Sequence, residues 1–155
     1  MKKKLYSLFI TTGTYRSFIE RICKLANDKT SSYVCVANVH MIMEAHRSES
    51  FSRIVNEADM VTPDGMPLVK SLRQLYGVQQ DRVAGMDLLP DLMSEAEKLS
   101  LPVYFYGGTE EILKRTKEYI SEKFPNLIFA GSYSPPYRPL TNEESLAVIT
   151  PGTTV

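Results

Sequence analysis

The chain has 155 residues, of which 18 are basic and 18 are acidic, so its formal net charge is zero. That length suits one domain with a sizeable buried core. Because the charges balance, no overall field would gather nucleic acid or draw the protein to anionic lipid, and we expect neither function. Cys23 and Cys35 lack metal-type or CxxC spacing, which predicts reduced core residues of a cytosolic protein.

The N-terminal segment consists of Met1, three lysines and an apolar run over 5–10. This arrangement imitates a signal peptide, but a run of six apolar residues is shorter than the usual hydrophobic region. We therefore predict a first strand over 5–10. No apolar run in the sequence approaches the ~20 residues that cross a bilayer, so we expect any membrane contact to be peripheral.

Short apolar runs alternate with helical periodicities along the chain, which is typical of βαβ units. After the first strand, the predicted elements in chain order are a helix over 15–27, a strand over 33–37, helices over 39–47 and 50–57, a strand over 60–62, helices over 66–76 and 88–99, a strand over 103–106, a helix over 110–123, a strand over 127–130, and a last helix that begins at the capping box 141–144. The predicted fold class is α/β, a Rossmann-like three-layer domain with a mostly parallel sheet. No linker or repeat divides the sequence, so we predict a single domain over 1–155.

The turn after the strand at 60–62 carries the most informative motif. Pro63 ends the strand, Asp64 follows at its carboxyl end, and Gly65 permits a turn with positive φ before the next helix. Enzymes of the α/β class keep ligands at this end of their strands, so Asp64 is a candidate catalytic residue. The alternative is that an Asp-Gly pair after proline serves the turn alone.

A second polar segment follows at 81–88. Arg82 precedes a short apolar stretch and Gly85, and its guanidinium can reach a diphosphate with a bidentate geometry that lysine cannot supply. A surface ion pair with Asp81 or Asp87 is the alternative, because most arginines are solvated or paired.

Taken in order, Asn38 after the second strand, Asp64 and Gly65 after the third, and the Pro- and Tyr-rich run 133–140 resemble the motifs of the WecG/TagA/CpsF glycosyltransferase family. The resemblance implies transfer of an N-acetylhexosamine or related hexose from a UDP-sugar to a polyprenyl-diphosphate-linked sugar. It places the reaction in teichoic acid or cell-surface polysaccharide synthesis, in the cytoplasm at the inner face of the membrane. It also implies that Asp64 is the general base of an inverting transfer and that Arg82 contacts the diphosphate.

Asn38 offers a donor and an acceptor for sugar hydroxyls or an N-acetyl group. It can also cap the next helix, and both roles can hold at once. The family commonly has threonine two residues earlier, whereas this chain has Val36. One candidate substrate contact is therefore missing.

Two further features carry candidate substrate-binding residues. Gly107 and Gly108 lie between a strand and a helix and could let backbone amides approach a phosphate, but acidic residues in the helix's first turn favour a tight turn instead. The loop with Tyr137 and Arg138 can close over a sugar nucleotide or form a rigid crossover fixed by its prolines. The sequence leaves these alternatives open.

His40 and Glu44 stand four residues apart and could supply two metal ligands, which is too few for a site. No Asp-x-Asp motif is present to hold a divalent cation, and the glycine fingerprints of nucleotide-binding loops are absent. We predict no protein-held metal and no cofactor.

Family members usually continue into a strand with a Gly-x-Pro-Lys-Gln-Glu type motif and a membrane-associated segment, which 149–155 does not resemble. We therefore expect a chain that is incomplete at its C-terminus, forms homo-oligomers through uncovered sheet surface, and has little or no activity. One rival hypothesis is an inactive remnant that binds nucleotide sugar or pairs with another chain. A second is an unrelated Rossmann-like nucleotide-binding domain.

Overall fold

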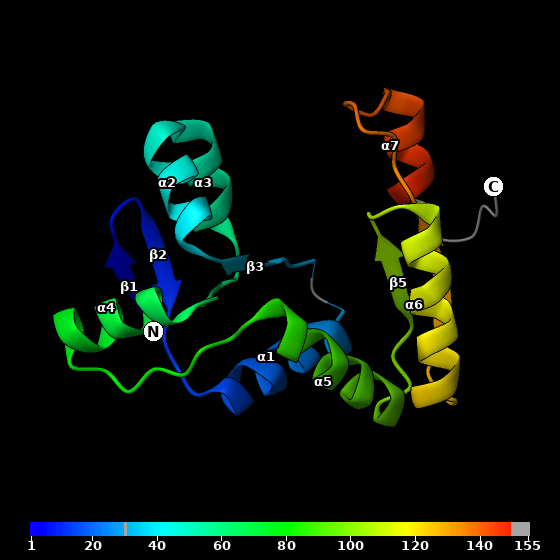
Figure 1. Ribbon diagram of the computed structural model, residues 1–155, viewed down its shortest axis with the longest axis horizontal. Helices are drawn as coiled ribbons and strands as arrows, with labels where there is room; N and C mark the ends of the chain where they lie inside the picture. The colour runs from blue at the N-terminus through cyan, green and yellow to red at the C-terminus, as the bar shows by residue number, and fades with distance from the viewer. Residues whose placement is uncertain (30, 150–155) are drawn as a thin grey trace. The chain divides into compact units, whose positions relative to one another are not determined.

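The computed structural model describes residues 1–29 and 31–149. The chain forms two compact units, Met1–Glu95 and Ala96–Val155, and each is described by itself. The elements in chain order are β1 (Lys2–Leu5), β2 (Leu8–Thr11), α1 (Tyr15–Asn27), β3 (Val34–Ala37), α2 (Val39–Arg47), α3 (Glu49–Glu57), β4 (Met60–Pro63), α4 (Met66–Tyr76), α5 (Gly85–Lys98), β5 (Val103–Tyr106), α6 (Glu110–Lys123), β6 (Phe129–Tyr133) and α7 (Asn142–Ile149) (Figure 1).

The first apolar run folds as a hairpin, so the prediction of one strand over 5–10 is wrong. β1 and β2 pair antiparallel around a turn in which Tyr6 has a φ of +53°. The Asn56 side chain fixes this turn: Nδ2 donates to the Ser7 carbonyl at 2.9 Å, and Oδ1 accepts from the Phe9 amide at 2.8 Å. Because both bonds come from α3, far along the chain, the local sequence does not indicate the turn.

β3 and β4 pair in parallel, with Ala37 opposite Pro63 at their carboxyl ends. β2 lies beside β4, where Oγ1 of Thr11 accepts a bond from the Val61 amide at 3.0 Å. Met60 and Val61 are consecutive residues of β4, and they enter different hydrophobic clusters because successive side chains of a strand point to opposite faces. Both faces of these strands are therefore covered.

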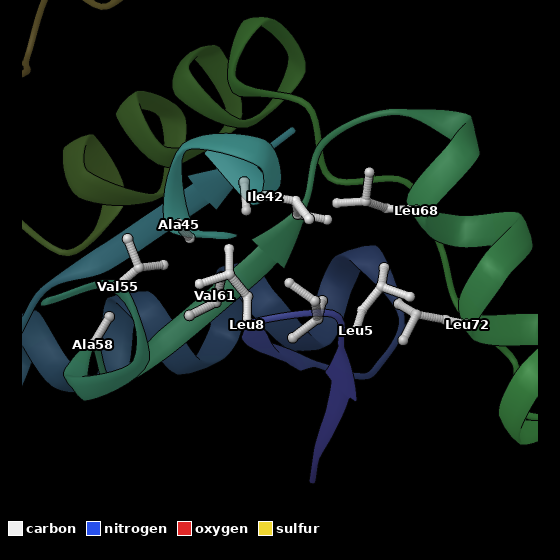
Figure 2. Close-up of a cluster of buried hydrophobic side chains, with 11 residues drawn as sticks. Leu5, Leu8, Ile42, Ala45, Val55, Ala58, Val61, Leu68 and Leu72 are labelled. Carbon is white, nitrogen blue, oxygen red and sulfur yellow. The ribbon is translucent and has the colours of Figure 1, made fainter. Parts of the chain in front are cut away.

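On one face, buried side chains from the strands meet those of α2, α3 and α4 (Figure 2). The members of this cluster are Leu5, Leu8, Ile10, Ala37, Ile42, Ala45, Val55, Ala58, Val61, Leu68 and Leu72. On the other face, Phe18 of α1 and Leu88 of α5 pack with Met60 and Val83. The first unit thus has three layers, helices on strands on helices, as the alternating apolar runs predict.

The second unit is built around the parallel pair β5 and β6. The rings of Phe105 and Phe129 stack with centroids 6.1 Å apart, and Nζ of Lys117 in α6 lies 5.5 Å from the Phe129 ring centroid. Ile120 of α6 is buried. Helix α6 therefore packs on β6.

The predicted α/β fold with mostly parallel strands is confirmed, since two of the three strand pairs among the described residues are parallel. Two further elements have a boundary that differs from the predicted one by more than one residue. Helix α5 begins at Gly85 because the Ala84 carbonyl already accepts from the Leu88 amide at 2.9 Å, so Asp87 lies in its first turn and does not cap it. Strand β6 is shifted from 127–130 to Phe129–Tyr133. The single-domain prediction stays a prediction, and residues 150–155, which bear on the expected C-terminal incompleteness, lie outside the described residues.

Candidate functional site

Asn38 and Asp64 follow the carboxyl ends of two hydrogen-bonded strands. The register of β3 and β4 ends with Ala37 opposite Pro63, and the Asp64 amide then donates to the Ala37 carbonyl at 2.7 Å. The chain therefore leaves both strands at one edge of the sheet. This edge is where open α/β folds bind their ligands.

The Asp64 carboxylate lies half-buried in the turn between β4 and α4. Gly65 follows with a φ of +109°, a backbone conformation that a side chain would strain, and α4 begins directly after it. Within residues 1–29 and 31–149, no hydrogen bond or ion pair engages the Asp64 carboxylate. Its oxygens are therefore available to a ligand.

Asn38 is the N-cap of α2, where its Oδ1 accepts from the Met41 amide at 3.0 Å. The capping role considered from the sequence is therefore present. The residue is exposed, and its Nδ2 has no protein partner in the described part of the chain. One side chain can thus hold the helix with its oxygen and offer its amide hydrogens beside Asp64.

A buried glutamine fixes the segment before Arg82. Gln80 is fully buried; its Nε2 donates to the carbonyls of Gly13 at 3.0 Å and Asp81 at 2.8 Å, and its Oε1 accepts from the Gly13 amide at 3.1 Å. The sequence reasoning missed this residue, because nothing local distinguishes it from its neighbour Gln79. Its role depends on hydrogen bonds to Gly13, which lies in the turn between β2 and α1 and is distant in sequence.

The segment after Arg82 is fixed to the sheet. The Val83 amide donates to the Pro63 carbonyl at 2.9 Å, and the Val83 side chain is fully buried. Arg82 is thus an exposed residue between two anchored ones. The backbone at Arg82 therefore lies next to Pro63, the last residue of β4, which directly precedes Asp64.

Of the two predicted ion-pair partners of Arg82, the structure has Asp87. Nη2 of Arg82 lies 2.5 Å from Oδ2 of Asp87, and the two side chains are 42% and 48% exposed. Asp81 instead accepts from the Tyr15 amide at 2.9 Å. Burial, and then the hydrogen bond from the Tyr15 hydroxyl to Asp91, raise the pKa of Tyr15 above its ordinary value.

Val36 stands directly opposite Thr62 in the paired strands β3 and β4. Oγ1 of Thr62 is fully buried and has no hydrogen-bond partner among the described residues. A buried hydroxyl is therefore present on β4, opposite Val36 of β3. The sequence reasoning did not single it out.

Gly107 and Gly108 lie in the second unit, in the turn between β5 and α6. Their φ angles are +106° and +78°, and the Gly107 amide donates to the Tyr133 carbonyl at 2.9 Å. Oγ of Ser134 donates to the Gly108 carbonyl at 2.7 Å. Both bonds join the two glycines to the end of β6 and the residue after it, so the choice between a tight turn and a phosphate contact stays open.

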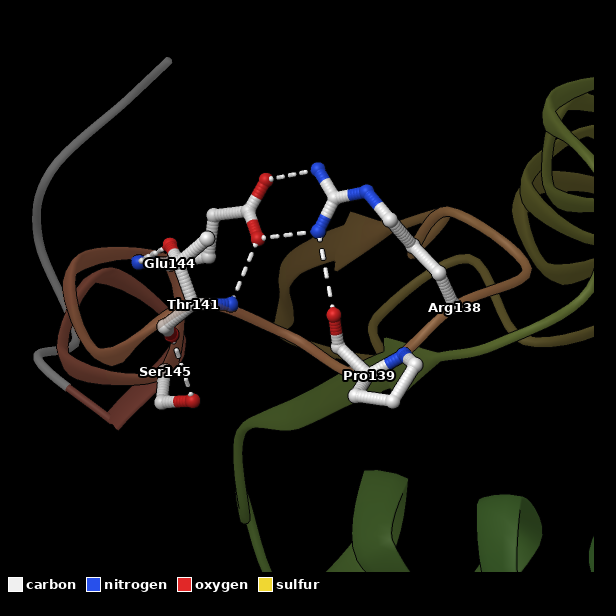
Figure 3. Close-up of polar contacts among 5 residues, drawn as sticks. All are labelled: Arg138, Pro139, Thr141, Glu144 and Ser145. Carbon is white, nitrogen blue, oxygen red and sulfur yellow. Dashed lines mark hydrogen bonds and ion pairs between the residues drawn. The ribbon is translucent and has the colours of Figure 1, made fainter.

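Tyr137 and Arg138 lie in the loop that precedes α7. The Tyr137 side chain is fully exposed. Nη1 and Nη2 of Arg138 donate to the two carboxylate oxygens of Glu144 at 2.9 and 2.7 Å, as Figure 3 shows. These bonds and those to Thr141 lower the pKa of Glu144 to about 2. Arg138 therefore holds the start of α7 in this structure.

The described residues contain no group of three or more His, Cys, Asp or Glu side chains that could hold a metal ion. His40 and Glu44, considered from the sequence as two metal ligands and too few for a site, belong to no such group there. No helix in the described part of the chain is both long and apolar enough to cross a membrane.

The sequence matches known proteins over nearly its whole length. The model of the glycosyl transferase WecG/TagA/CpsF family matches residues 3–151. A protein of Bacillus spizizenii named N-acetylglucosaminyldiphosphoundecaprenol N-acetyl-beta-D-mannosaminyltransferase is 29% identical over 136 residues, which are 87% of this chain and 52% of that protein. The protein of the same name in Bacillus subtilis is 26% identical over 134 residues, 86% of this chain and 52% of its own length.

The chain thus spans about half the length of the curated relatives it matches. The match includes both strand ends with Asn38 and Asp64 and the segment with Arg82. The chain belongs to the WecG/TagA/CpsF glycosyltransferase family.

Proposed function

We propose that this chain takes part in transferring a sugar from a UDP-sugar to a polyprenyl-diphosphate-linked sugar, in the synthesis of teichoic acid or another cell-surface polysaccharide. The transferred sugar is an N-acetylhexosamine or a related hexose. The names of the relatives, whose acceptor is an N-acetylglucosaminyl diphosphoundecaprenol, support this substrate class. The reaction would take place in the cytoplasm at the inner face of the membrane, with the protein in peripheral contact and associated as a homo-oligomer.

The observation that carries the proposal is the Asp64 carboxylate, half-buried at a strand end with no partner in the described chain and with Asn38 at the adjacent strand end. A general base must lie within hydrogen-bond reach of the proton that it removes. Asp87, by contrast, is paired with Arg82. Asp64 is free for this role.

The proposed reaction is a single displacement with inversion. Asp64 takes the proton of the acceptor hydroxyl as its oxygen attacks the anomeric carbon, and the bond from that carbon to the UDP oxygen breaks on the opposite side. The departing diphosphate gains negative charge, which the Arg82 guanidinium stabilises with hydrogen bonds. Asn38 binds a sugar hydroxyl or the N-acetyl group, and Gly65 keeps the turn at Asp64 open.

Gly107, Gly108, Tyr137 and Arg138 remain proposed contacts of the sugar nucleotide. For Arg138 this role requires exchange of its bonds to Glu144 for bonds to the ligand. We propose no metal ion or cofactor in the reaction.

The test is sugar transfer from a panel of UDP-sugars to a polyprenyl-diphosphate-linked N-acetylglucosamine. It is run on this chain and on a version extended with a C-terminal segment of the family type. In whichever form is active, Asp64→Asn should lower turnover by about two to four orders of magnitude and leave UDP affinity largely unchanged. Asp28→Asn, which changes an exposed aspartate after α1 in the same way, is the matched control and should be neutral.

Near wild-type turnover of Asp64→Asn would remove Asp64 from the mechanism. If neither form transfers any sugar but both bind UDP-sugars, the chain is the non-catalytic binding module that the sequence leaves as a rival. Absence of both transfer and binding would contradict the proposed function as a whole.

A further inference from the structure

The Arg82 guanidinium is already engaged by a carboxylate in this structure. Nη2 of Arg82 donates to Oδ2 of Asp87, and no second hydrogen bond to the Asp87 side chain is present in the described residues. Asp87 lies in the first turn of α5, whose start is fixed by bonds of its backbone to the Ala84 carbonyl. The carboxylate is therefore not needed to satisfy the helix end, and its contact is with Arg82.

The backbone around Arg82 is held in place, so only side chains have to move. Gln80 on one side and Val83 on the other are both fully buried and hydrogen-bonded. A carboxylate oxygen and a phosphate oxygen bind a guanidinium in the same way, through charge-assisted N–H bonds. The ion pair is about half exposed, and ion pairs of that kind are weak and screened, so one anion can replace the other readily.

We propose that Asp87 is an internal counter-ion that occupies Arg82 until the donor diphosphate replaces it, and that takes Arg82 back when UDP leaves. This inference rests on the proposed function. Asp87 then acts as a positioning residue: it lowers the affinity of the site for UDP and speeds the release of that product. The exchange breaks one hydrogen bond from the guanidinium to a carboxylate and forms hydrogen bonds to the diphosphate, with no covalent change.

The consequence is a defined coupling between two side chains. Removing the Asp87 charge removes the competitor of the diphosphate, so Asp87→Asn should tighten UDP binding by roughly threefold to fivefold. The gain should be absent when Arg82 is Gln, because there is then no guanidinium to release. It should also shrink at high ionic strength.

The experiment is calorimetric titration of UDP into the full chain and its variants Asp87→Asn, Asp87→Ser, Arg82→Gln and Arg82→Gln with Asp87→Asn. The matched control is Asp91→Asn, which removes the same charge one turn later on α5, from a residue bonded to the Tyr15 hydroxyl. The control should change UDP affinity by less than about twofold, because it removes a negative charge from α5 without removing the carboxylate that contacts Arg82. Thermal melting verifies that every variant is folded.

Unchanged or weaker UDP binding in both Asp87 variants would overturn the inference, as would an equal gain in Asp91→Asn or a gain that persists without Arg82. If the wild-type chain binds UDP and Arg82→Gln weakens that binding, the proposed donor site stands even when the Asp87 variants show no gain. If neither the wild type nor any variant binds UDP, the donor site is absent and both proposals fail.

Discussion

Replacing Gln80 with leucine is expected to destabilise the first unit markedly and to weaken the site around Arg82 at the same time. Gln80 is fully buried and joins the segment before Arg82 to the turn at Gly13 through two hydrogen bonds, and its Nε2 also donates to the Asp81 carbonyl. Its backbone carbonyl also accepts two bonds from the Arg73 guanidinium. Leucine has a similar volume, so the substitution tests the polar contacts and not the packing.

The magnitude follows from the three side-chain bonds. Each contributes about 0.5–1.5 kcal/mol net, and their loss also leaves the partly buried amide and carbonyl of Gly13 without these partners. The expected loss of unfolding free energy is therefore about 3 kcal/mol. For a chain of this length, that corresponds to a fall in melting temperature of roughly 6–12 °C.

Thermal and urea unfolding followed by far-ultraviolet circular dichroism measure this change. Gln79→Leu is the matched control, because Gln79 is adjacent, exposed and has no side-chain hydrogen bond among the described residues, so its substitution should shift stability by less than about 0.5 kcal/mol. Calorimetric titration should also show weaker UDP binding in Gln80→Leu at a temperature where it is folded. Equal melting temperatures for the two leucine variants would refute the reasoning.

Three further predictions concern local structure. Gly77→Ala should cost about 1 kcal/mol in urea unfolding, because the α4 C-cap has a φ of +61° and the added methyl meets no atom within 4 Å that could compensate. Gly131→Ala should cost about 1–3 kcal/mol, since its φ is +138° and the Cβ would lie 2.9 Å from the Tyr104 ring; Tyr104→Ala should recover part of this loss. The Glu144 carboxyl should titrate near pH 2 by NMR, so the stability that its ionised form adds is present above about 4.5 and is lost as the pH falls toward 2; Arg138→Gln should move the midpoint up toward 4.5.

The helices of the fold follow from local signals that the sequence displays. Three helices begin at a residue whose side-chain oxygen accepts a hydrogen bond from a backbone amide of the first turn: Thr14, Asn38 and Thr109. Each of these residues stands in the sequence before an apolar repeat of helical spacing. The hairpin of β1 and β2 could not be predicted in this way. Its turn depends on Asn56, which is close in space and distant in sequence.

The edge of the sheet that carries the candidate site was predictable because it depends only on strand direction. A polar residue directly after a buried parallel strand lies at the carboxyl edge wherever the strand sits, and Asn38 and Asp64 both follow such strands. The partner of Arg82 was not predictable. Asp81 and Asp87 are both near it in sequence, and the choice depends on the Tyr15 amide, which binds Asp81.

Asp64 and Arg82, two of the three central residues of the site, are positioned by backbone bonds and not by their own side chains. Asp64 is held through its amide to Ala37, and the segment of Arg82 through the Val83 amide to Pro63. Side-chain substitutions at these two positions therefore leave the bonds that fix the backbone intact, so a loss of activity would report on chemistry. Asn38 is different, because its Oδ1 caps α2. Asn38→Asp keeps an acceptor for the Met41 amide and removes the donor, which makes it the substitution that separates sugar binding from helix capping.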